Sequence, residues 1–336
     1  MGSQLTYKTR KIIPIAIAVF LGGIRDGDFD HISNTTLGFE HIYAIGLKER
    51  TDKRDFLTVS ASVTGFEVDW VDGVHSQELQ QKALPNGYNL STIQPNAVGC
   101  WRAHMNVLNS VIANSYSSAL VLEDDADWDV NIKTQLREFA RGLHSLKGDK
   151  RYPNRLLTEL IGIFSGLEGV RQGQIKMKLN STPFLKIQQS QVSNVDTHGL
   201  ALWIAGKRCF LKTRHGSFTA LKKAAALMEA PVDLAMSELC GGTGDRERIE
   251  CFAPFPNLIG TYRPAGPAFK DSDINSGDQT VHEEQAYNLV YSTRRNIHRL
   301  VSGAETVLSQ WGEESPWSPG EVNPKGLVYP RGYHFH

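Results

Sequence analysis

The chain has 336 residues, enough to bury one large hydrophobic core or two modest ones, and its hydrophobic content of 40% is ordinary for a globular protein. Lys plus Arg and Asp plus Glu each total 36, so the formal net charge is zero. This composition excludes a disordered protein and argues against nucleic-acid binding, since no overall positive field attracts phosphate. An acidic ligand would have to be bound by local geometry.

The N-terminus carries basic residues ahead of an apolar run over residues 12–23. The run has the length of a signal-peptide core and is short for a membrane span, which indicates a secretory signal or a signal anchor. The alternative is a first buried strand, because Pro14 and the lack of a small-residue cleavage pattern fit a signal poorly. Three N-glycosylation sequons agree with a lumenal location, at Asn34, Asn89 and Asn180.

The first expected strand, residues 41–47, is followed by a basic loop and then by a helix through Phe56 and Val63. This order suits an anion, because a helix N-terminus offers free N–H groups and a favourable dipole. Arg50 and Arg54 would add bidentate contacts to a phosphate. The alternative is a solvated charged face without a ligand.

A second strand is expected over residues 66–71, and a helix over residues 97–113 that begins at an Asn96 cap. His104 lies on this helix, where a histidine is more often a packing residue than a ligand. A third strand, residues 119–122, continues the alternation of strands and helices. The sequence therefore predicts an α/β fold with a Rossmann-type, mainly parallel sheet flanked by helices.

The third strand runs directly into a series of acidic residues, namely Glu123, Asp124, Asp125, Asp127 and Asp129. Open α/β sheets bind ligands at this end of their strands. Like charges repel one another unless a cation lies among them, and carboxylate oxygens suit Mg²⁺ or Mn²⁺. The first three acids are therefore candidate ligands of a metal that holds a diphosphate. The alternative is that they face water, and Asp129 is expected to cap the helix that follows.

The second half of the sequence is less regular. Residues 147–197 are expected to form a long loop with one short element, followed by short strands and by a helix over residues 217–229. Asp233 lies in a turn with apolar neighbours, where a carboxylate could have a raised pKa and act as a base. Capping of residues 234–239 is an equal alternative for this aspartate.

Two strands are expected over residues 252–256 and 258–262, followed by a polar loop in which Arg263 and Lys270 would close over phosphates. Residues 280–301 are expected to form a final helix, and residues 302–336 to be poorly ordered. The four cysteines include no C-x-x-C pair, so a structural zinc site has little support. Cys240 and Cys251 are a candidate disulfide pair by placement alone.

The order and spacing of several motifs across residues 41–275 resemble glycosyltransferase family 25, the lipopolysaccharide and collagen-type galactosyltransferases, and the chain looks closest to the fungal branch. The matching residues are Leu47, Arg50, Asp52 and Arg54; Gly99, Cys100 and His104; Leu122 to Ala126; Pro231 to Asp233; and Arg263 to Gly266. The chain departs from the family at Gly46, where Asn is usual, and at Ala103, where Ser is usual. Residues 147–197 also lack the family's Trp-Asp-Leu-Leu-Trp-Leu-Gly strand, unless residues 202–206 are its remnant.

The resemblance implies a GT-A-like domain over residues 40–278, preceded by a signal or anchor with a stem (residues 1–39) and followed by a helix and tail (residues 279–336). It implies transfer of a sugar, commonly galactose from UDP-galactose, with inversion, to a glycan or glycoprotein acceptor in the Golgi lumen or outside the cell. The implied site residues are Glu123, Asp124 and Asp125 for Mn²⁺ or Mg²⁺, Arg50, Arg54, His104 and Arg263 for the nucleotide sugar, and Asp233 as the acceptor base.

Two other functions fit parts of the sequence. The altered region over residues 147–197 suits a catalytically degenerate protein that binds a nucleotide sugar without transferring it. A receiver-like phospho-acceptor domain also places paired acids at a strand end to bind Mg²⁺. That reading needs a separate phosphorylated Asp and a Lys on later strands, and the sequence offers no convincing pair.

Overall fold

The computed structural model describes residues 17–20, 30–84, 93–116, 118–148, 175–176, 186–188, 204–205, 232, 251–255, 258–274, 279–287, 289–310, 312 and 314–316. The α-helices with described bounds are α1 (Thr51–Val63), α2 (Pro95–Ala113), α3 (Ile132–Gly148) and the short α6 (Ile297–Val301). The strands of the first half are β1 (Ile17–Phe20), β2 (His41–Gly46), β3 (Asp69–Asp72), β4 (Ser118–Glu123) and β5 (Ala126–Trp128).

The strands of the second half are β6 (Ile175–Lys176), β7 (Lys186–Gln188), β8 (Ile204–Ala205), β9 (Cys251–Phe255), β10 (Ile259–Arg263), β11 (Gly266–Pro267), β12 (Val281–His282), β13 (Gln285–Tyr287), β14 (Thr306–Leu308) and β15 (Glu314–Pro316). Short 3-10 turns lie at Asp30–Ser33, Ser76–Glu78, Gln81–Ala83 and Ala268–Lys270.

The central sheet has the strand order β1-β4-β2-β3. Strands β4, β2 and β3 run parallel to one another, and β1 pairs antiparallel with β4. The predicted mainly parallel sheet is therefore confirmed. β2 and β4 are continuous apolar runs because strands at the centre of such a sheet are buried on both faces.

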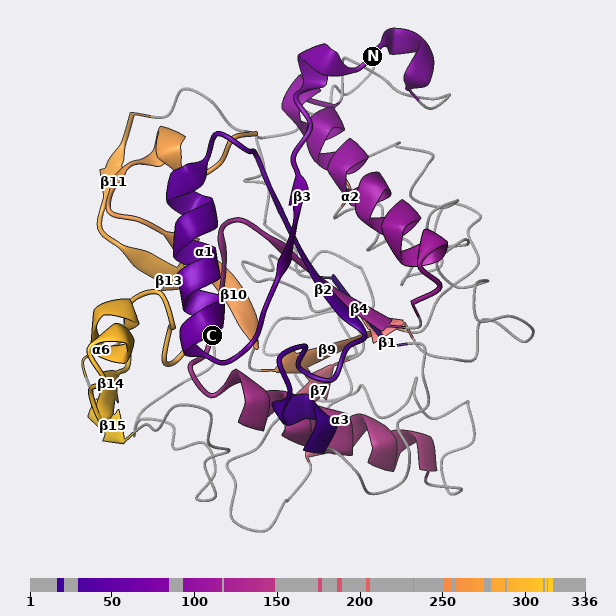
Figure 1. Ribbon diagram of the computed structural model, residues 1–336. Helices are drawn as coiled ribbons and strands as arrows, with labels where there is room; N and C mark the ends of the chain where they lie inside the picture. The colour runs from indigo at the N-terminus through magenta and orange to yellow at the C-terminus, as the bar shows by residue number, and fades with distance from the viewer. Residues whose placement is uncertain are drawn as a thin grey trace, which may run out of the picture.

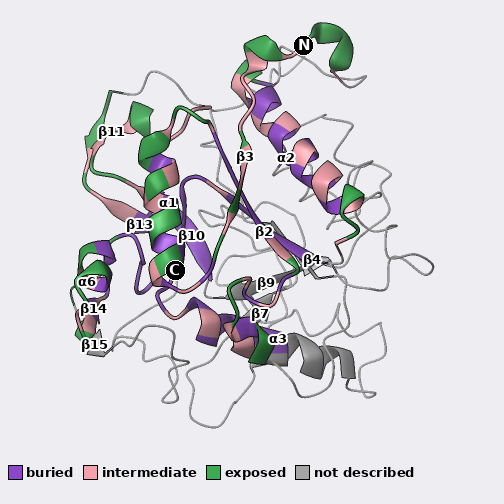
Figure 2. Ribbon diagram, in the orientation of Figure 1, coloured by how far each residue is buried: buried purple, intermediate pink, exposed green. Residues whose placement is uncertain are grey.

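Helices cover both faces of this sheet (Figure 1). One core cluster, between the sheet and α2, includes Tyr43, Ile45, Trp101, Met105, Ala119 and Val121. The other, between the sheet and helices α1 and α3, includes Ile42, Ala44, Leu57, Leu120, Leu122, Leu136 and Phe139. Successive residues of β2 and β4 thus alternate between the α2 side and the α1 side, as strand geometry requires. Figure 2 shows these strands buried between helices whose outward surfaces carry exposed residues.

A second sheet of order β13-β10-β5 continues from the acidic stretch. Its formation contradicts the predicted helix over residues 280–301, which holds β12, β13 and only the short α6. In β13 the middle residue, Ala286, is buried while its neighbours are not, which is the alternation of a half-buried strand. Pairing of β13 with β10 outweighs the local helical preference.

The C-terminal region also differs from its prediction. Residues 302–336 were expected to be poorly ordered, but β14 and β15 pair antiparallel, and Val307 is 1% exposed in a small core cluster with Leu300. Residues 317–336 lie outside the described part of the chain. The ordered hairpin is stabilised by burial of Val307, which a composition-based reading of the segment does not detect.

Helix α2 begins at a different residue from the one predicted. Gln94 is the N-cap and Pro95 occupies the first turn, where its missing N–H costs nothing. Asn96 therefore lies inside the helix and does not cap it. Its side-chain Nδ2 donates instead to the backbone oxygen of Asp273, 2.9 Å away.

Several predictions fall partly or wholly outside the described residues. The expected helix over residues 217–229, the Cys240 partner of the candidate disulfide and Asp233 itself are among them. The predicted signal or anchor is described only at Ile17–Phe20, which forms strand β1, the alternative considered for this run. None of the described helices is long and apolar enough to cross a membrane.

The predicted helix cap at Asp129 is wrong, because its side chain accepts hydrogen bonds from residues outside α3. Asp129 is 1% exposed, and its Oδ1 accepts the N–H of Asn131, just before the helix, at 2.9 Å. Its Oδ2 accepts the N–H of Tyr291 at 3.2 Å. Burial raises the pKa of Asp129 to about 6 despite these hydrogen bonds.

This raised pKa predicts a pH-dependent stability. The group titrates at about 3.9 in an unfolded chain, so the stability gained by protonating it in the fold is complete below that pH and is lost as pH rises through about 6. The Asp129→Asn variant has no carboxyl at this position and therefore lacks this pH-dependent contribution to stability. The unfolding free energy of the variant, relative to the unaltered protein, should therefore rise by about 2 kcal/mol between about pH 4 and pH 8. Denaturant titrations at both pH values measure the difference. An unfolding free energy that changes equally with pH in the two proteins would contradict the raised pKa of Asp129.

Candidate functional site

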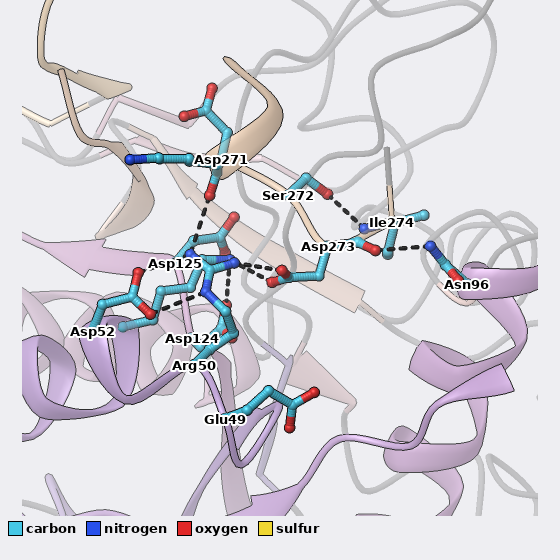
Figure 3. Close-up of polar contacts among 12 residues, drawn as sticks. Glu49, Arg50, Asp52, Asn96, Asp124, Asp125, Asp271, Ser272, Asp273 and Ile274 are labelled. Atoms are coloured by element: carbon cyan, nitrogen blue, oxygen red, sulfur yellow. Dashed lines mark hydrogen bonds and ion pairs between the residues drawn. The ribbon is translucent and has the colours of Figure 1, made fainter. Parts of the chain in front are cut away.

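Six charged side chains gather where β2 and β4 end and α1 begins (Figure 3). This charge cluster consists of Arg50, Lys53, Asp124, Asp125, Arg263 and Asp273. The carboxyl ends of parallel strands are where open α/β sheets bind ligands, and the N-terminus of α1 adds a positive dipole end. The cluster therefore lies where a ligand was predicted, although its members come from segments more than 200 positions apart.

Lys53 occupies the middle of the charge cluster and is 8% exposed. Its Nζ lies 3.2 Å from Asp124 Oδ1 and 2.9 Å from Asp273 Oδ2. Burial works against its charge, but the surrounding carboxylates outweigh burial and raise the pKa of Lys53. The lysine is therefore a fixed buried cation, and it was not among the predicted site residues.

Asp124 is held against the backbone of Gly46. A Cβ built on Gly46 would lie 2.8 Å from Asp124 Cβ, so any side chain there would displace the aspartate. The absence of a side chain at Gly46 makes room for this placement of Asp124. Burial raises the pKa of Asp124 to about 6, while Lys53 opposes that shift.

Asp125 is paired on one side only. Its Oδ2 accepts a hydrogen bond of 2.9 Å from Arg263 NH1, which also donates to the backbone oxygen of Asp271 at 2.8 Å. Its Oδ1 is buried and has no hydrogen-bond partner. A buried carboxylate oxygen without a partner is costly, and a bound cation would satisfy it.

Asp273 bridges two cations at the start of α1. One of its oxygens pairs with Arg50 and the other with Lys53. Burial raises the pKa of this carboxyl, but Lys53 and Arg50 together hold it below its usual range. Arg50 also forms a fork with Asp52, at 3.0 and 2.9 Å, and donates to the backbone oxygen of Lys270 at 3.2 Å. Asp273 thus joins Arg50 to Lys53 at the start of α1.

A buried arginine supports the acidic stretch from behind. Arg294 is 3% exposed, and its NH2 donates to the backbone oxygen of Asp124 at 2.8 Å. Asp127, which is fully buried, accepts the N–H of Arg294 at 3.1 Å and a hydrogen bond from Ser292. Burial lowers the pKa of Arg294, although Asp127 and its acidic neighbours oppose this. Sequence reasoning missed Arg294 because the predicted helix over residues 280–301 gave it no buried role.

Glu123 points away from the charge cluster. Strand alternation sends it to the α2 side, where its Oε1 lies 3.4 Å from His104 Nε2. His104 is 2% exposed, and burial lowers its pKa. Arg54 is also separate, because it pairs with Asp72 at 2.7 Å and lies over the Trp70 ring. Of the predicted residues, the structure thus brings together Arg50, Asp124, Asp125 and Arg263, whose ligands remain predictions.

Residues 39–156 match the family model described as glycosyltransferase family 25 (LPS biosynthesis protein). The resemblance to glycosyltransferase family 25 is confirmed. The family 25 segment runs from β2 to α3 and carries four members of the charge cluster, namely Arg50, Lys53, Asp124 and Asp125. Assignment to a fungal branch stays a prediction.

Relatives with similar sequences belong to the same family. The chain is 28% identical over 124 residues to mouse procollagen galactosyltransferase 2, which covers 34% of this chain and 20% of that protein. It is 27% identical over 122 residues to the human inactive glycosyltransferase 25 family member 3, covering 33% of this chain and 20% of that protein. The chain thus matches about a fifth of the length of these relatives. No solved structure matches the chain.

Proposed function

We propose that this chain is a glycosyltransferase that moves a sugar from a nucleotide diphosphate sugar, UDP-galactose by family analogy, to a glycan or glycoprotein acceptor with inversion. The observation that carries the proposal is the charge cluster, which presents Arg50 and Lys53 at a helix N-terminus within the family 25 segment. Such a position suits a diphosphate, because cations and free backbone N–H groups both favour negative charge. A location in the secretory pathway is part of the proposal and agrees with the sequon at the exposed Asn34.

The diphosphate would enter by replacing the carboxylate of Asp273. Both cations that hold Asp273 are already in place, and the loop that carries it contacts α1 through Arg50 and Lys53 and α2 through Asn96. The diphosphate carries one more negative charge than the carboxylate that it would replace, and a divalent metal would offset that charge. In this state Arg50 and Lys53 would stabilise the charge that develops on the leaving diphosphate.

A divalent metal, Mn²⁺ or Mg²⁺, is a further part of the proposal. Asp125 fits it, because its buried Oδ1 has no hydrogen-bond partner, and Asp124 is the neighbouring carboxylate that would share it. When bound, such an ion offsets charge on the diphosphate of the donor. Glu123 does not share this position, since it faces α2.

The transfer step needs a base for the acceptor hydroxyl, and Asp233 is the proposed base. The residue before it, Val232, is 4% exposed and belongs to the core cluster between α2 and the sheet. The residue next to Asp233 in the chain therefore lies on the α2 side of the sheet. A binding-only protein that lacks this step is the alternative, and measured transfer decides between the two.

Ligand affinities of three variants test the proposed diphosphate site. Arg50→Ala should weaken UDP binding about tenfold or more and leave free uridine unchanged, because hydrogen bonds to charged groups contribute about 1.5–3 kcal/mol. Asp273→Asn should strengthen UDP binding several-fold, since the amide competes less well for the two cations. Lys48→Ala, an exposed basic residue of the same loop, is the matched control with no expected effect. Calorimetry measures all three, and equal losses of UDP and uridine in Arg50→Ala would place this arginine outside the site.

A further inference from the structure

A second group of potential ligands lies on the α2 side of the sheet. Cys100 and His104 are four residues apart on α2 and therefore share one face of the helix. Glu123, at the end of β4, points toward them. Cys100 Sγ lies 3.8 Å from Glu123 Oε1, and His104 Nε2 lies 3.4 Å from the same oxygen. One ligand atom from each of the three residues lies within 4.8 Å of the others.

We propose that Cys100, His104 and Glu123 form a binding site for a zinc-class transition metal, separate from the charge cluster. Bond lengths of about 2.0–2.3 Å to zinc give ligand-to-ligand distances of roughly 3.3–3.8 Å in a tetrahedron. The distances from Glu123 Oε1 to Cys100 Sγ and to His104 Nε2 fall in or at the edge of this range. A metal bound by these three side chains would join α2 to the end of β4, which directly precedes Asp124.

The hydrogen bonding of His104 gives an independent reason for a cation here. Its Nδ1 lies 3.0 Å from the backbone oxygen of Cys100, which only accepts, so Nδ1 carries the hydrogen. Nε2 then bears a lone pair, is buried and has no hydrogen-bond partner. This lone pair faces a carboxylate oxygen of Glu123. A buried lone pair that faces a carboxylate oxygen favours a cation between the two atoms.

The ligand types select the metal. A thiolate and an imidazole favour Zn²⁺ and similar transition metals, whereas Mg²⁺ and Mn²⁺ favour oxygen ligands alone. The bond from His104 Nδ1 to a backbone carbonyl is the support that histidine ligands commonly have, because it fixes the tautomer and the ring orientation. Three protein ligands leave a fourth position for water or another small ligand.

Strand alternation separates this site from the proposed donor site. Glu123 faces α2, while Asp124 faces Lys53 of α1 on the other side of the sheet. A metal at Cys100, His104 and Glu123 would therefore stabilise the strand end without contacting the diphosphate. The two sites are expected to respond to different metals and to different substitutions.

Cobalt binding to the purified full-length chain tests the site. Co²⁺ added to the metal-free protein should give a thiolate-to-cobalt charge-transfer band with tetrahedral d–d bands, and one equivalent of Zn²⁺ should displace it and raise the melting temperature. Cys100→Ser should abolish the charge-transfer band, and Glu123→Gln should weaken Zn²⁺ binding tenfold or more. Cys209→Ser is the matched control and should keep both signals.

Three further results of these experiments would decide against the proposed metal site. Absence of a thiolate band in folded, unaltered protein, or an unchanged Zn²⁺ affinity in Glu123→Gln, would overturn the proposal. Glu123 is partly exposed, so its substitution tests the site even where replacement of the buried His104 prevents folding. Asp125→Asn should leave the cobalt spectrum unchanged, and loss of the spectrum in that variant would instead assign the metal to the charge cluster.

Discussion

Replacement of Arg294 by methionine should lower the unfolding free energy by about 3–5 kcal/mol, because it leaves buried carboxylates without their cation. Arg294 is 3% exposed, and its guanidinium lies over the rings of Phe56 and Tyr262, at 5.2 and 5.4 Å. Methionine keeps the apolar contacts of the stem but removes the charge that faces Asp127. Denaturant unfolding of the two proteins measures the difference.

Its neighbour provides the control. Arg295 pairs with Glu284 at 3.3 Å on the surface, so Arg295→Met should cost less than about 1 kcal/mol. Combining Arg294→Met with Asp127→Asn should recover part of the loss, because the second change removes the buried negative charge that the guanidinium no longer offsets. Equal costs for Arg294→Met and Arg295→Met would contradict the supporting role of Arg294.

The first half of the fold could be predicted from the sequence because each element carries its own periodicity. β2, α1, α2 and β4 each have apolar residues at the spacing that their structure requires, and each starts within a few residues of its predicted position. The predicted helix over residues 280–301 failed because β13 depends on a partner, β10, that lies some twenty positions earlier in the chain. Local sequence patterns do not predict pairing between strands that are distant in the chain.

Only some of the acids and some of the cations of the candidate site could be predicted from the sequence. Asp124 and Asp125 were predicted because they form a charged pair at the end of a strand, where α/β sheets bind ligands. Arg50 was predicted because it also lies just after a strand. Lys53 and Asp273 become site residues only when segments distant in sequence meet, so no spacing rule could identify them. The buried acids did imply counter-charges, and Lys53, Arg263 and Arg294 supply them.

The division of Glu123 from Asp124 follows from strand geometry. Side chains of successive strand residues point to opposite faces, so three adjacent acids at a strand end do not all converge on one ion. Glu123 instead meets Cys100 and His104, which come from a helix. A search for C-x-x-C pairs does not detect this group, because its cysteine and histidine are spaced for a helix face and its third member lies on another element.

Asp233→Asn is expected to reduce sugar transfer by about a hundredfold or more while UDP-sugar affinity stays nearly unchanged. Inverting transfer requires a base on the face of the sugar opposite the departing UDP, and a carboxylate such as Asp233 can take up the proton of the acceptor hydroxyl. The asparagine keeps the shape and hydrogen-bonding capacity of the side chain but does not accept the proton. Steady-state transfer from UDP-galactose, with UDP affinity by calorimetry, measures both quantities.

The competing role for Asp233 makes the opposite prediction. If this aspartate only caps the segment over residues 234–239, the variant should transfer sugar normally, since Asn caps about as well as Asp. Glu238→Gln, an acidic residue five positions further on, is the matched control and should keep full activity. A melting curve for each variant separates loss of the base from loss of the fold. Retained transfer in a folded Asp233→Asn variant would rule out the base, whereas transfer lost with UDP-sugar binding and melting temperature both preserved would assign Asp233 to the proton-transfer step.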